Sequence, residues 1–342
     1  MREPKPARDS TRSRVFLRGM TATPYDLRAV VECVPNFSEG RDLAKVREIA
    51  AAIEATPGVL LLGWEADADH NRSVITFAGP LDAVVEAAVR GVGRAAELID
   101  LRDHVGAHPR IGAADVVPFV PLDLLSASPG CESVVFGKDQ EAGENLADCA
   151  RAAHRAGEEI WQRFGIPSYF YEAAALKPER ARLEKTRRKG FDGSPPDVGD
   201  IPAHPTAGAC MIGARRILIA YNVDLETKDQ QVAQEIAKKV RESSGGFRYV
   251  KAMGLYLPSR DCAQVSMNLT RYEEIPLMDL LRAIDEEAVR LGMRAGAGEL
   301  IGMIPRRAFE MAPEFFQRAA NFDAGRIIET RILTLTQANR VV

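Results

Sequence analysis

The sequence has no long hydrophobic run and no strong excess of one charge. No apolar stretch approaches the roughly 20 residues that a helix needs to cross a bilayer, so a membrane-spanning protein is not expected. The 45 basic and 48 acidic side chains leave a formal net charge of -3, and this balance gives no overall attraction to nucleic acid or to an anionic membrane. We therefore expect no nucleic-acid partner and no membrane partner.

Paired cysteines are also missing. The five cysteines are odd in number, are scattered along the chain and form no C-x-x-C motif, which argues against a zinc site or a redox-active dithiol. This cysteine usage favours a reducing, cytoplasmic location. The first residues are mostly polar and lack the apolar core of a secretory signal, so we expect residues 1–29 to be a disordered tail or a mis-called N-terminal extension.

The sequence does have enough apolar residues for a large core, and its order of elements repeats. The 342 residues are 46% hydrophobic, which suffices for two domains or one duplicated domain. Apolar periodicity and turn residues predict a strand, a helix, two strands, a helix and a strand at 30–34, 43–53, 59–64, 73–77, 80–98 and 116–120. The same order recurs at 217–223, 230–240, 249–257, 263–269, 276–291 and 300–304.

The order β-α-β-β-α-β in each half is typical of ferredoxin-like folds. The predicted fold class is α+β, with two tandem ferredoxin-like (βαββαβ) subdomains at residues 30–192 and 193–342 and a ligand cleft between them. The alternative is an ordinary α/β chain in which two segments agree by chance. The agreement in order and length, and the proline at the start of the second helix of each half, favour duplication.

His104 and His108 lie four residues apart, a spacing that on a helix would suit zinc. Gly106 and Pro109 disfavour a helix there, which argues against a metalloprotease site. What remains is an imidazole on a stiff, irregular segment before a buried strand, and such a group suits proton transfer. The segment 67–78 begins like a calcium-binding loop but lacks the required glycine and glutamate, so no metal is expected.

Four stretches, in this order, resemble the formiminotransferase family of glutamate formimidoyltransferases. They are VECVPNFSEG at 31–40, NRSV at 71–74, HVGAHPRIGAADV at 104–116 and GARRILIAYN at 213–222. The resemblance implies a cytoplasmic enzyme that moves a formimidoyl group between N-formimidoyl-L-glutamate and tetrahydrofolate, giving 5-formimidoyltetrahydrofolate and glutamate, in histidine degradation. It implies tetrahydrofolate as co-substrate, no metal and a homodimer. Animal members carry a fused cyclodeaminase domain, so here deamination would need a separate cyclodeaminase.

The family's catalytic histidine matches His108. An imidazole can take the proton from an attacking amine and return one to the departing nitrogen at neutral pH. The resemblance also places Glu65 near this histidine, where a carboxylate would accept the imidazole N–H and hold its tautomer. The alternative is that Glu65 ends a strand and is solvated.

Five further residues are candidates for binding the substrate or facing the cleft. Arg72 and Arg110 have the guanidinium fork that pairs with glutamate carboxylates, although surface solvation is equally compatible with either. His104 is a candidate for a substrate hydrogen bond or an orienting contact to His108, or is a solvated loop residue. Asn36 and Asn222 occupy matching places after the first strand of each half; turn chemistry is the competing interpretation.

The resemblance aligns residues 199–208 with the family's folate-binding stretch. The residues predicted to bind folate are Gly199, His204, Pro205, Thr206, Ala207 and Gly208. Ala207 stands where animal members have tryptophan, which removes an aromatic surface for a folate ring; His204 is a possible flat replacement or a solvated histidine. Two other functions stay open: formyl transfer from N-formylglutamate to tetrahydrofolate, and folate binding without turnover.

Overall fold

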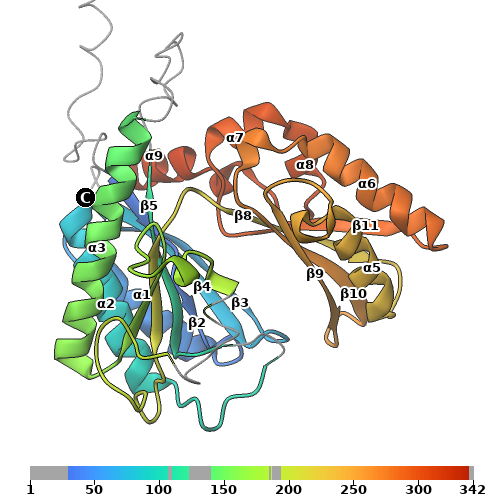
Figure 1. The fold of residues 1–342 in the computed structure, drawn as a ribbon. Helices are drawn as coiled ribbons and strands as arrows, with labels where there is room; N and C mark the ends of the chain where they lie inside the picture. Colours follow the sequence, from blue (N-terminus) through green and yellow to red (C-terminus); the bar gives the residue numbers. More distant parts are fainter. Residues whose placement is uncertain (1–29, 107–109, 123–139, 185, 187–193, 339–342) are drawn as a thin grey trace, which may run out of the picture.

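The computed structural model describes residues 30–106, 110–122, 140–184, 186 and 194–338 (Figure 1). The prediction for residues 1–29 and the candidate His108 lie outside the described residues. Figure 1 shows two sheets, each with its own helices. Within the described residues, no helix is both long and apolar enough to span a bilayer.

The first sheet is built mainly from the predicted elements of the first half. These are β1 (Val30–Cys33), β2 (Asn36–Phe37), α1 (Leu43–Glu54), β3 (Leu60–Asp67), β4 (Arg72–Pro80), α2 (Leu81–Leu98) and β5 (Ala114–Pro121). β1 and β2 are two parts of one strand interrupted at Pro35, since both pair antiparallel with β4 and β5. β3 pairs with the outer edge of β4. The strand order is therefore β3, β4, β1/β2, β5.

Two more strands and a helix enlarge this unit. α3 (Gln140–Phe164) leads to β6 (Ser168–Glu172), and β7 (Cys210–Ala214) runs parallel between β5 and β6. The predicted boundary at residues 192 and 193 is therefore wrong for the sheet, because β7 belongs to the first half. Parallel pairing joins segments that are distant in the sequence, and local periodicity does not reveal it.

The second sheet repeats the arrangement of the first four strand positions. Its elements are β8 (Ile219–Leu225), α5 (Gln230–Val240), β9 (Val250–Leu257), β10 (Cys262–Leu269), α6 (Leu277–Arg290) and β11 (Ala295–Ile301). The strand order is β11, β8, β10, β9, with antiparallel pairing throughout. In both halves the fourth strand therefore lies beside the first, and the third lies between the first and the second.

The last strand of the second half was predicted too late, at 300–304. β11 spans Ala295–Ile301, and the glycines near its start pack closely against β8. A Cβ on Gly298 would lie 2.0 Å from the hydroxyl oxygen of Tyr221, so only glycine leaves room for that buried ring. A glycine-rich segment has a weak strand pattern, which explains the error.

The helices cover one face of each sheet. α1, α2 and α3 pack on the first sheet around Phe37, Phe77 and Phe119, and α5 and α6 pack on the second. α1 and α5 each begin at an aspartate, Asp42 and Asp229, whose carboxylate accepts from N–H groups of the first turn. Further helices of the described chain are α7 (Arg306–Met311), α8 (Pro313–Gln317) and α9 (Ile328–Ala338). Short 3-10 turns lie at η3 (Pro178–Arg180), η4 (Glu242–Ser244), η5 (Tyr272–Glu274) and η6 (Ala324–Arg326).

α9 returns from the second half and packs on the opposite face of the first sheet. Ile328 and Ile332 form a buried apolar cluster with Leu60 and Leu62 of β3. The Nε of Arg331 donates to the carbonyl oxygen of Leu62 over 2.8 Å. The two halves are thus joined by packing as well as by the chain.

The β3–β4 and β9–β10 hairpins have the same geometry. Asp67 pairs with Arg72 in the first hairpin, and Leu257 pairs with Cys262 in the second, so the loops 68–71 and 258–261 have equal length. The last loop residue is left-handed in both, with φ 48° at Asn71 and φ 51° at Asp261. This match supports an internal duplication beyond the order of elements alone.

Candidate functional site

The first three motifs meet on the first half. The hydroxyl of Ser38 donates to the carbonyl oxygen of Gly112 over 2.7 Å, and the N–H of Gly40 donates to the side-chain oxygen of Asn71 over 3.0 Å. A Cβ on Gly40 would lie 2.2 Å from the carbonyl oxygen of Asp67, so glycine permits this close contact. The segments 31–40, 71–74 and 104–116 therefore form one structural unit.

Asn71 holds the loop that precedes His108. Its side-chain N–H donates to the carbonyl oxygen of Val105 over 3.0 Å, and its own carbonyl oxygen lies 3.2 Å from the Nε2 of His104. Asn71 is buried, and both bonds are partly shielded from water. The described residues on one side of His108 are thus fixed by the 67–71 turn.

Arg110, on the other side of His108, contacts the ring of His104. A guanidinium has no acceptor, and the Nε2 of His104 faces the Asn71 carbonyl, so the consistent assignment is Nε2–H donating to Asn71 and Nδ1 accepting from Arg110. Burial lowers the pKa of Arg110, partly offset by the charge of Asp115. His104 thus links Asn71 with Arg110, and its predicted contact with substrate or with His108 stays a prediction.

Arg72 interacts with Asn36 and with a buried carboxylate. The Nε of Arg72 donates to the Oδ1 of Asn36 over 2.8 Å, and its Nη2 lies 3.3 Å from the Oδ2 of Asp115. Asp115 is 1% exposed, and its other oxygen accepts from the N–H of Ile111 over 2.9 Å. Arg72 therefore neutralises Asp115, and its proposed grip on a substrate carboxylate stays a prediction.

A pocket of about 550 Å³ lies beside this unit. It brings together the predicted substrate residues His104 and Arg110 and the predicted folate residues His204, Pro205 and Gly208. The other lining residues are Leu101, Arg102, Val105, Gly106, Ile111 and Ala203. Its walls combine apolar side chains with two arginines, a suitable lining for a flat ligand with carboxylates.

Glycines allow the two pocket loops to approach. Gly112 and Gly208 form an antiparallel bridge. A Cβ would lie 1.9 Å from the Ala209 carbonyl oxygen at Gly112 and 2.2 Å from the Ile111 carbonyl oxygen at Gly208, where φ is +69°. The sequence therefore places glycine where no other residue fits.

His204 organises its own loop. Its Nδ1 accepts from the N–H of Ala207 over 3.0 Å, and the carbonyl oxygen of Thr206 accepts from the N–H of Leu101 over 2.8 Å. Ala207 is 2% exposed and packs into the core of the first half. Neither Thr206 nor Ala207 lines the pocket, so the alanine removes no aromatic surface from this pocket's described lining.

Gly199, also predicted to bind folate, lies elsewhere. A Cβ there would lie 2.7 Å from the ring of Trp161 on α3, and φ is +90°. Gly199 therefore packs against the helix layer, whereas the loop 203–208 reaches the pocket. The predicted folate segment is divided between two environments.

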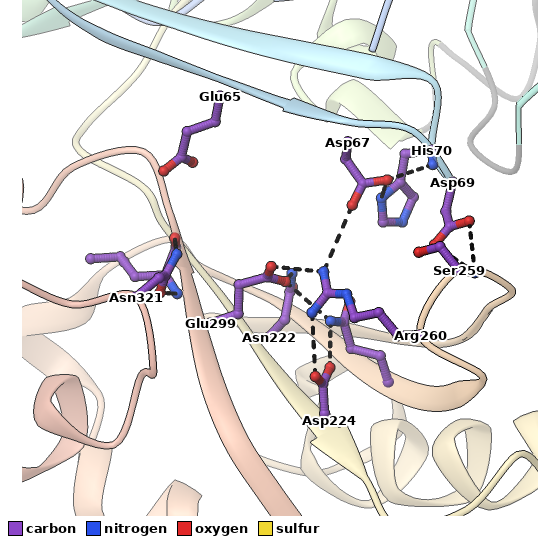
Figure 2. Close-up of polar contacts among 12 residues, drawn as sticks. Glu65, Asp67, Asp69, His70, Asn222, Asp224, Ser259, Arg260, Glu299 and Asn321 are labelled. Carbon is purple, nitrogen blue, oxygen red and sulfur yellow. Dashed lines mark hydrogen bonds and ion pairs between the residues drawn. The ribbon is translucent and has the colours of Figure 1, made fainter. Parts of the chain in front are cut away.

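Glu65 points toward the second half, as Figure 2 shows. Its Oε2 accepts from the N–H of Gly302 over 2.8 Å, and its Oε1 forms an ion pair with Arg326. Both oxygens of the carboxylate are thus engaged at the interface between the halves. Its predicted contact with His108 stays a prediction, because His108 lies outside the described residues.

Sequence reasoning missed three titratable residues next to this unit: Asp67, His70 and Arg260. The Oδ1 of Asp67 accepts from the N–H of His70 over 2.7 Å and lies 3.1 Å from its Nδ1. Burial alone would raise the pKa of Asp67, but the hydrogen bonds of His70 and the charges of His70 and Arg260 lower it to about 2. The available signal was the spacing of Glu65 and Asp67, which places two carboxylates on one face of β3, with Asp69 following in the hairpin loop.

Asn36 and Asn222 lie at different register positions in the two halves. Asn36 pairs with Val74, two residues beyond Arg72, whereas Asn222 pairs with Ser266, four residues beyond Cys262. Asn36 lies opposite Val116 of β5, and Asn222 lies opposite Glu299 of β11. Asn222 donates to the Oε2 of Glu299 over 3.1 Å. Figure 2 shows both residues in a cluster of polar side chains, with Asp224 and Arg260, that faces β3. The predicted match of the two asparagines is therefore not found in the strand register, since Asn222 lies within β8. Their role in binding stays a prediction.

Within the described parts of the chain, no group of three or more His, Cys, Asp or Glu side chains is arranged to hold a metal ion. The described site offers hydrogen-bond donors, two cationic side chains and an imidazole, which are groups for binding anions and moving protons.

Comparisons with known proteins assign the family. Residues 30–215 match the N-terminal subdomain of the formiminotransferase domain, and residues 220–335 match the formiminotransferase domain. The chain therefore belongs to the formiminotransferase family. It is 38% identical to glutamate formimidoyltransferase of Streptococcus pyogenes, covering 89% of this chain and 99% of that protein. It is 37% identical to glutamate formimidoyltransferase of Thermoplasma acidophilum over 89% of this chain and 97% of that protein.

Fused relatives also match. The chain is 35% identical to formimidoyltransferase-cyclodeaminase of Gallus gallus over 84% of its length, and the match covers 52% of that protein. The chain thus spans about half of this animal relative and almost all of the two microbial relatives. The resemblance found in the sequence motifs is confirmed.

Proposed function

We propose that this protein is an enzyme that transfers a formimidoyl group between N-formimidoyl-L-glutamate and tetrahydrofolate. The observation that carries the proposal is the pocket shared by the His104–Arg110 loop and the 203–208 loop. Membership of the family and the names of the two microbial relatives support the same reaction. The metabolic setting that fits is histidine degradation.

Each half is, in our assignment, a ferredoxin-like unit. The support is the β-α-β-β-α-β order together with the strand order in which the fourth strand lies beside the first. We place the units at residues 30–215 and 216–338, and we assign the ligand cleft to the region where the faces free of α1, α2, α5 and α6 approach each other.

Tetrahydrofolate fits the pocket as co-substrate. Its volume, about 550 Å³, lies within the range of about 300–1,000 Å³ typical of small-molecule sites. His204, Pro205 and Leu101 offer flat or apolar contacts, and Arg110 offers a cation for a carboxylate. When bound, tetrahydrofolate supplies the nucleophilic amine.

His108 is assigned the proton steps. It removes a proton from the attacking amine and returns one to the departing nitrogen, since an imidazole exchanges protons readily near neutral pH. Asn71, His104 and Arg110 hold the loop on both sides of it. Arg72 and Asn36 are assigned to the glutamate end of the substrate through the carboxylate-binding geometry of a guanidinium.

His108→Ala tests this assignment. We expect kcat for formimidoyl transfer to fall about 100- to 10,000-fold, while calorimetry still detects tetrahydrofolate binding. Arg282→Ala, which removes an exposed charge on α6, is the matched control and should keep full activity. Unchanged turnover of His108→Ala would remove its role in proton transfer.

The same assay separates the competing functions. N-formylglutamate as donor tests formyl transfer side by side with formimidoyl transfer. Tetrahydrofolate binding without turnover of either donor would indicate a folate-binding protein. We also propose a cytoplasmic homodimer, and light scattering of the purified protein measures its oligomeric state.

A further inference from the structure

The two equivalent hairpins meet at the interface between the halves. The hydroxyl of Ser259 donates to the Oδ2 of Asp69 over 2.6 Å, and Figure 2 shows this contact beside that of Arg260 with Asp67. Asp69 and Ser259 hold the same position in their loops, because 67 pairs with 72 and 257 with 262. The duplicated units therefore touch through corresponding residues.

Arg260 is held in place by its own half. Its Nη2 lies 2.7 Å from the Oε1 of Glu299, and its Nη1 lies 3.3 Å from the Oδ2 of Asp224. Its Nη2 also lies 3.8 Å from the Oδ2 of Asp67 in the first half. Asp224 and Glu299 are linked in turn through the side-chain amide of Gln264, which is 0% exposed. This arrangement fixes the direction of the guanidinium before it meets Asp67.

Asp67 transmits this contact to the candidate site. Its Oδ1 binds the N–H and faces the Nδ1 of His70, and the next residue, Asn71, binds His104 and Val105. A Cβ on Gly106 would lie 2.5 Å from the carbonyl oxygen of His70, so this turn and the loop before His108 are in close contact.

We propose that Arg260 is a positioning residue. It reaches from the second half to hold the Asp67–His70 pair and, through Asn71, the loop at residues 104–106 that precedes His108. Without its charge, Asp67, Asp224 and Glu299 face one another with no guanidinium between them, and their repulsion displaces the 67–71 turn. The second half thus completes a site whose described pocket lies on the first half. This inference rests on the proposed function.

The test measures steady-state formimidoyl transfer by the full chain and its variants. Because small displacements of reacting groups are costly, we expect Arg260→Ala to lower kcat roughly 10- to 100-fold, with less than about a threefold change in KM for tetrahydrofolate. Arg260→Lys should recover part of kcat, since it keeps the charge. Adding Asp67→Asn should cost less in the Arg260→Ala protein than in the wild type, because it removes the repelled charge.

Arg331→Ala is the matched control. It removes another bond between the halves, from Arg331 to Leu62, with no route to His104. Equal losses of kcat in Arg260→Ala and Arg331→Ala would overturn the proposal, because both would then act through docking alone. Additive effects of Arg260→Ala and Asp67→Asn would overturn it as well.

A second readout does not depend on turnover. The NMR signals of the His70 ring, assigned through their loss in His70→Gln, should shift in Arg260→Ala and stay in place in Arg331→Ala. Unshifted signals in Arg260→Ala would overturn the proposal. An inactive wild type would contradict the proposed function, and the NMR comparison would still decide the role of Arg260.

Discussion

At the scale of single residues, Gly208 sets the distance between the two loops of the candidate pocket. We expect Gly208→Ala to destabilise the protein by about 2–3 kcal/mol or more, because it combines a left-handed backbone with a backbone clash. The clash is with the Ile111 carbonyl oxygen, 2.2 Å from the added Cβ. Tetrahydrofolate affinity should fall with it. Chemical denaturation and calorimetry measure the two effects.

Gly245→Ala is the control for Gly208→Ala. Gly245 has φ +86°, but an added Cβ would meet no atom within 4 Å. Its cost is the left-handed backbone alone, about 1–2 kcal/mol, and folate binding should be unaffected. If both variants bound folate as the wild type does, the close approach of the loops would be irrelevant to the pocket.

Single site residues could be predicted from the sequence where they lie in a motif whose residue types indicate their chemistry. His104, Arg110, His204, Pro205 and Gly208 were placed at the site by resemblance, and the structure brings these five to one pocket. The packing of Ala207 into the core was not foreseen. Burial depends on which segments lie beside a residue, and a loop sequence does not contain that information.

At the scale of elements, a buried ion pair fixes the segment between β6 and β7. Arg180 and Asp197 are 3% and 2% exposed and form an ion pair. Arg180 also donates to the hydroxyl of Ser194, and Asp197 accepts from the N–H of Phe170 in β6. We expect Asp197→Ala to lower the free energy of unfolding by about 3–5 kcal/mol, because it leaves a buried guanidinium without its counter-ion.

Denaturant titration compares Asp197→Ala with Asp148→Ala. Asp148 forms an exposed ion pair with Arg151 on α3, with side chains 46% and 70% exposed. Such a pair contributes at most about 1 kcal/mol, so its loss should be small. Equal losses of unfolding free energy in the two variants would mean that burial does not increase the contribution of the Arg180–Asp197 pair to stability.

Most elements were predictable because their pattern is local. α1, α2, α5 and α6 follow helical periodicity, and the hairpin strands follow turn residues. β7 was assigned to the wrong half, and β11 was placed too late. Both errors concern strands whose partners, β5 and β8, lie far away in the sequence, where pairing rather than propensity decides.

At the scale of the whole molecule, β3 joins the halves in two ways. Near its start, Leu60 and Leu62 pack against α9, and near its end Glu65 and Asp67 bind polar groups of the second half. Apolar packing is not screened by ionic strength, whereas partly exposed ion pairs weaken as salt rises. The contact between the halves at the end of β3 is therefore more sensitive to salt concentration than the contact at its start.

A buried carboxylate beside the α9 contact makes stability depend on pH. Burial raises the pKa of Glu32 from 4.5 to about 7, opposed by Arg215 and reinforced by Glu329 of α9. The folded state thus binds this proton more tightly than the unfolded state. The stabilisation is complete below about pH 4.5 and is lost as the pH rises through 7, a change of about 3 kcal/mol for a shift of this size.

Glu32→Gln removes this titration. Relative to the wild type, we expect the variant to gain about 3 kcal/mol of stability between pH 4 and pH 8, measured by urea denaturation at each pH. Glu314→Gln, on the exposed side of α8, should leave the pH profile unchanged. A Glu32→Gln profile parallel to that of the wild type would contradict the assignment.

The division into two similar halves was predictable from order and length, but their contact was not. Asp69 and Ser259 hold equivalent loop positions and bind each other, yet nothing in either loop sequence indicates that the loops meet. The same holds for Arg260, whose partners come from β3, β8 and β11. Such contacts depend on the docking of complete units, so only a three-dimensional structure reveals them.

The packing of α9 against β3 has a consequence for folding during translation. Arg331 and Leu62 are bonded across 269 residues of chain. At translation rates of about 5–20 residues per second, roughly 15 to 50 s pass between the synthesis of the two. During that time α9 does not yet cover Leu60 and Leu62. The nascent first half therefore exposes an apolar patch, to which a chaperone can bind until α9 has been synthesised.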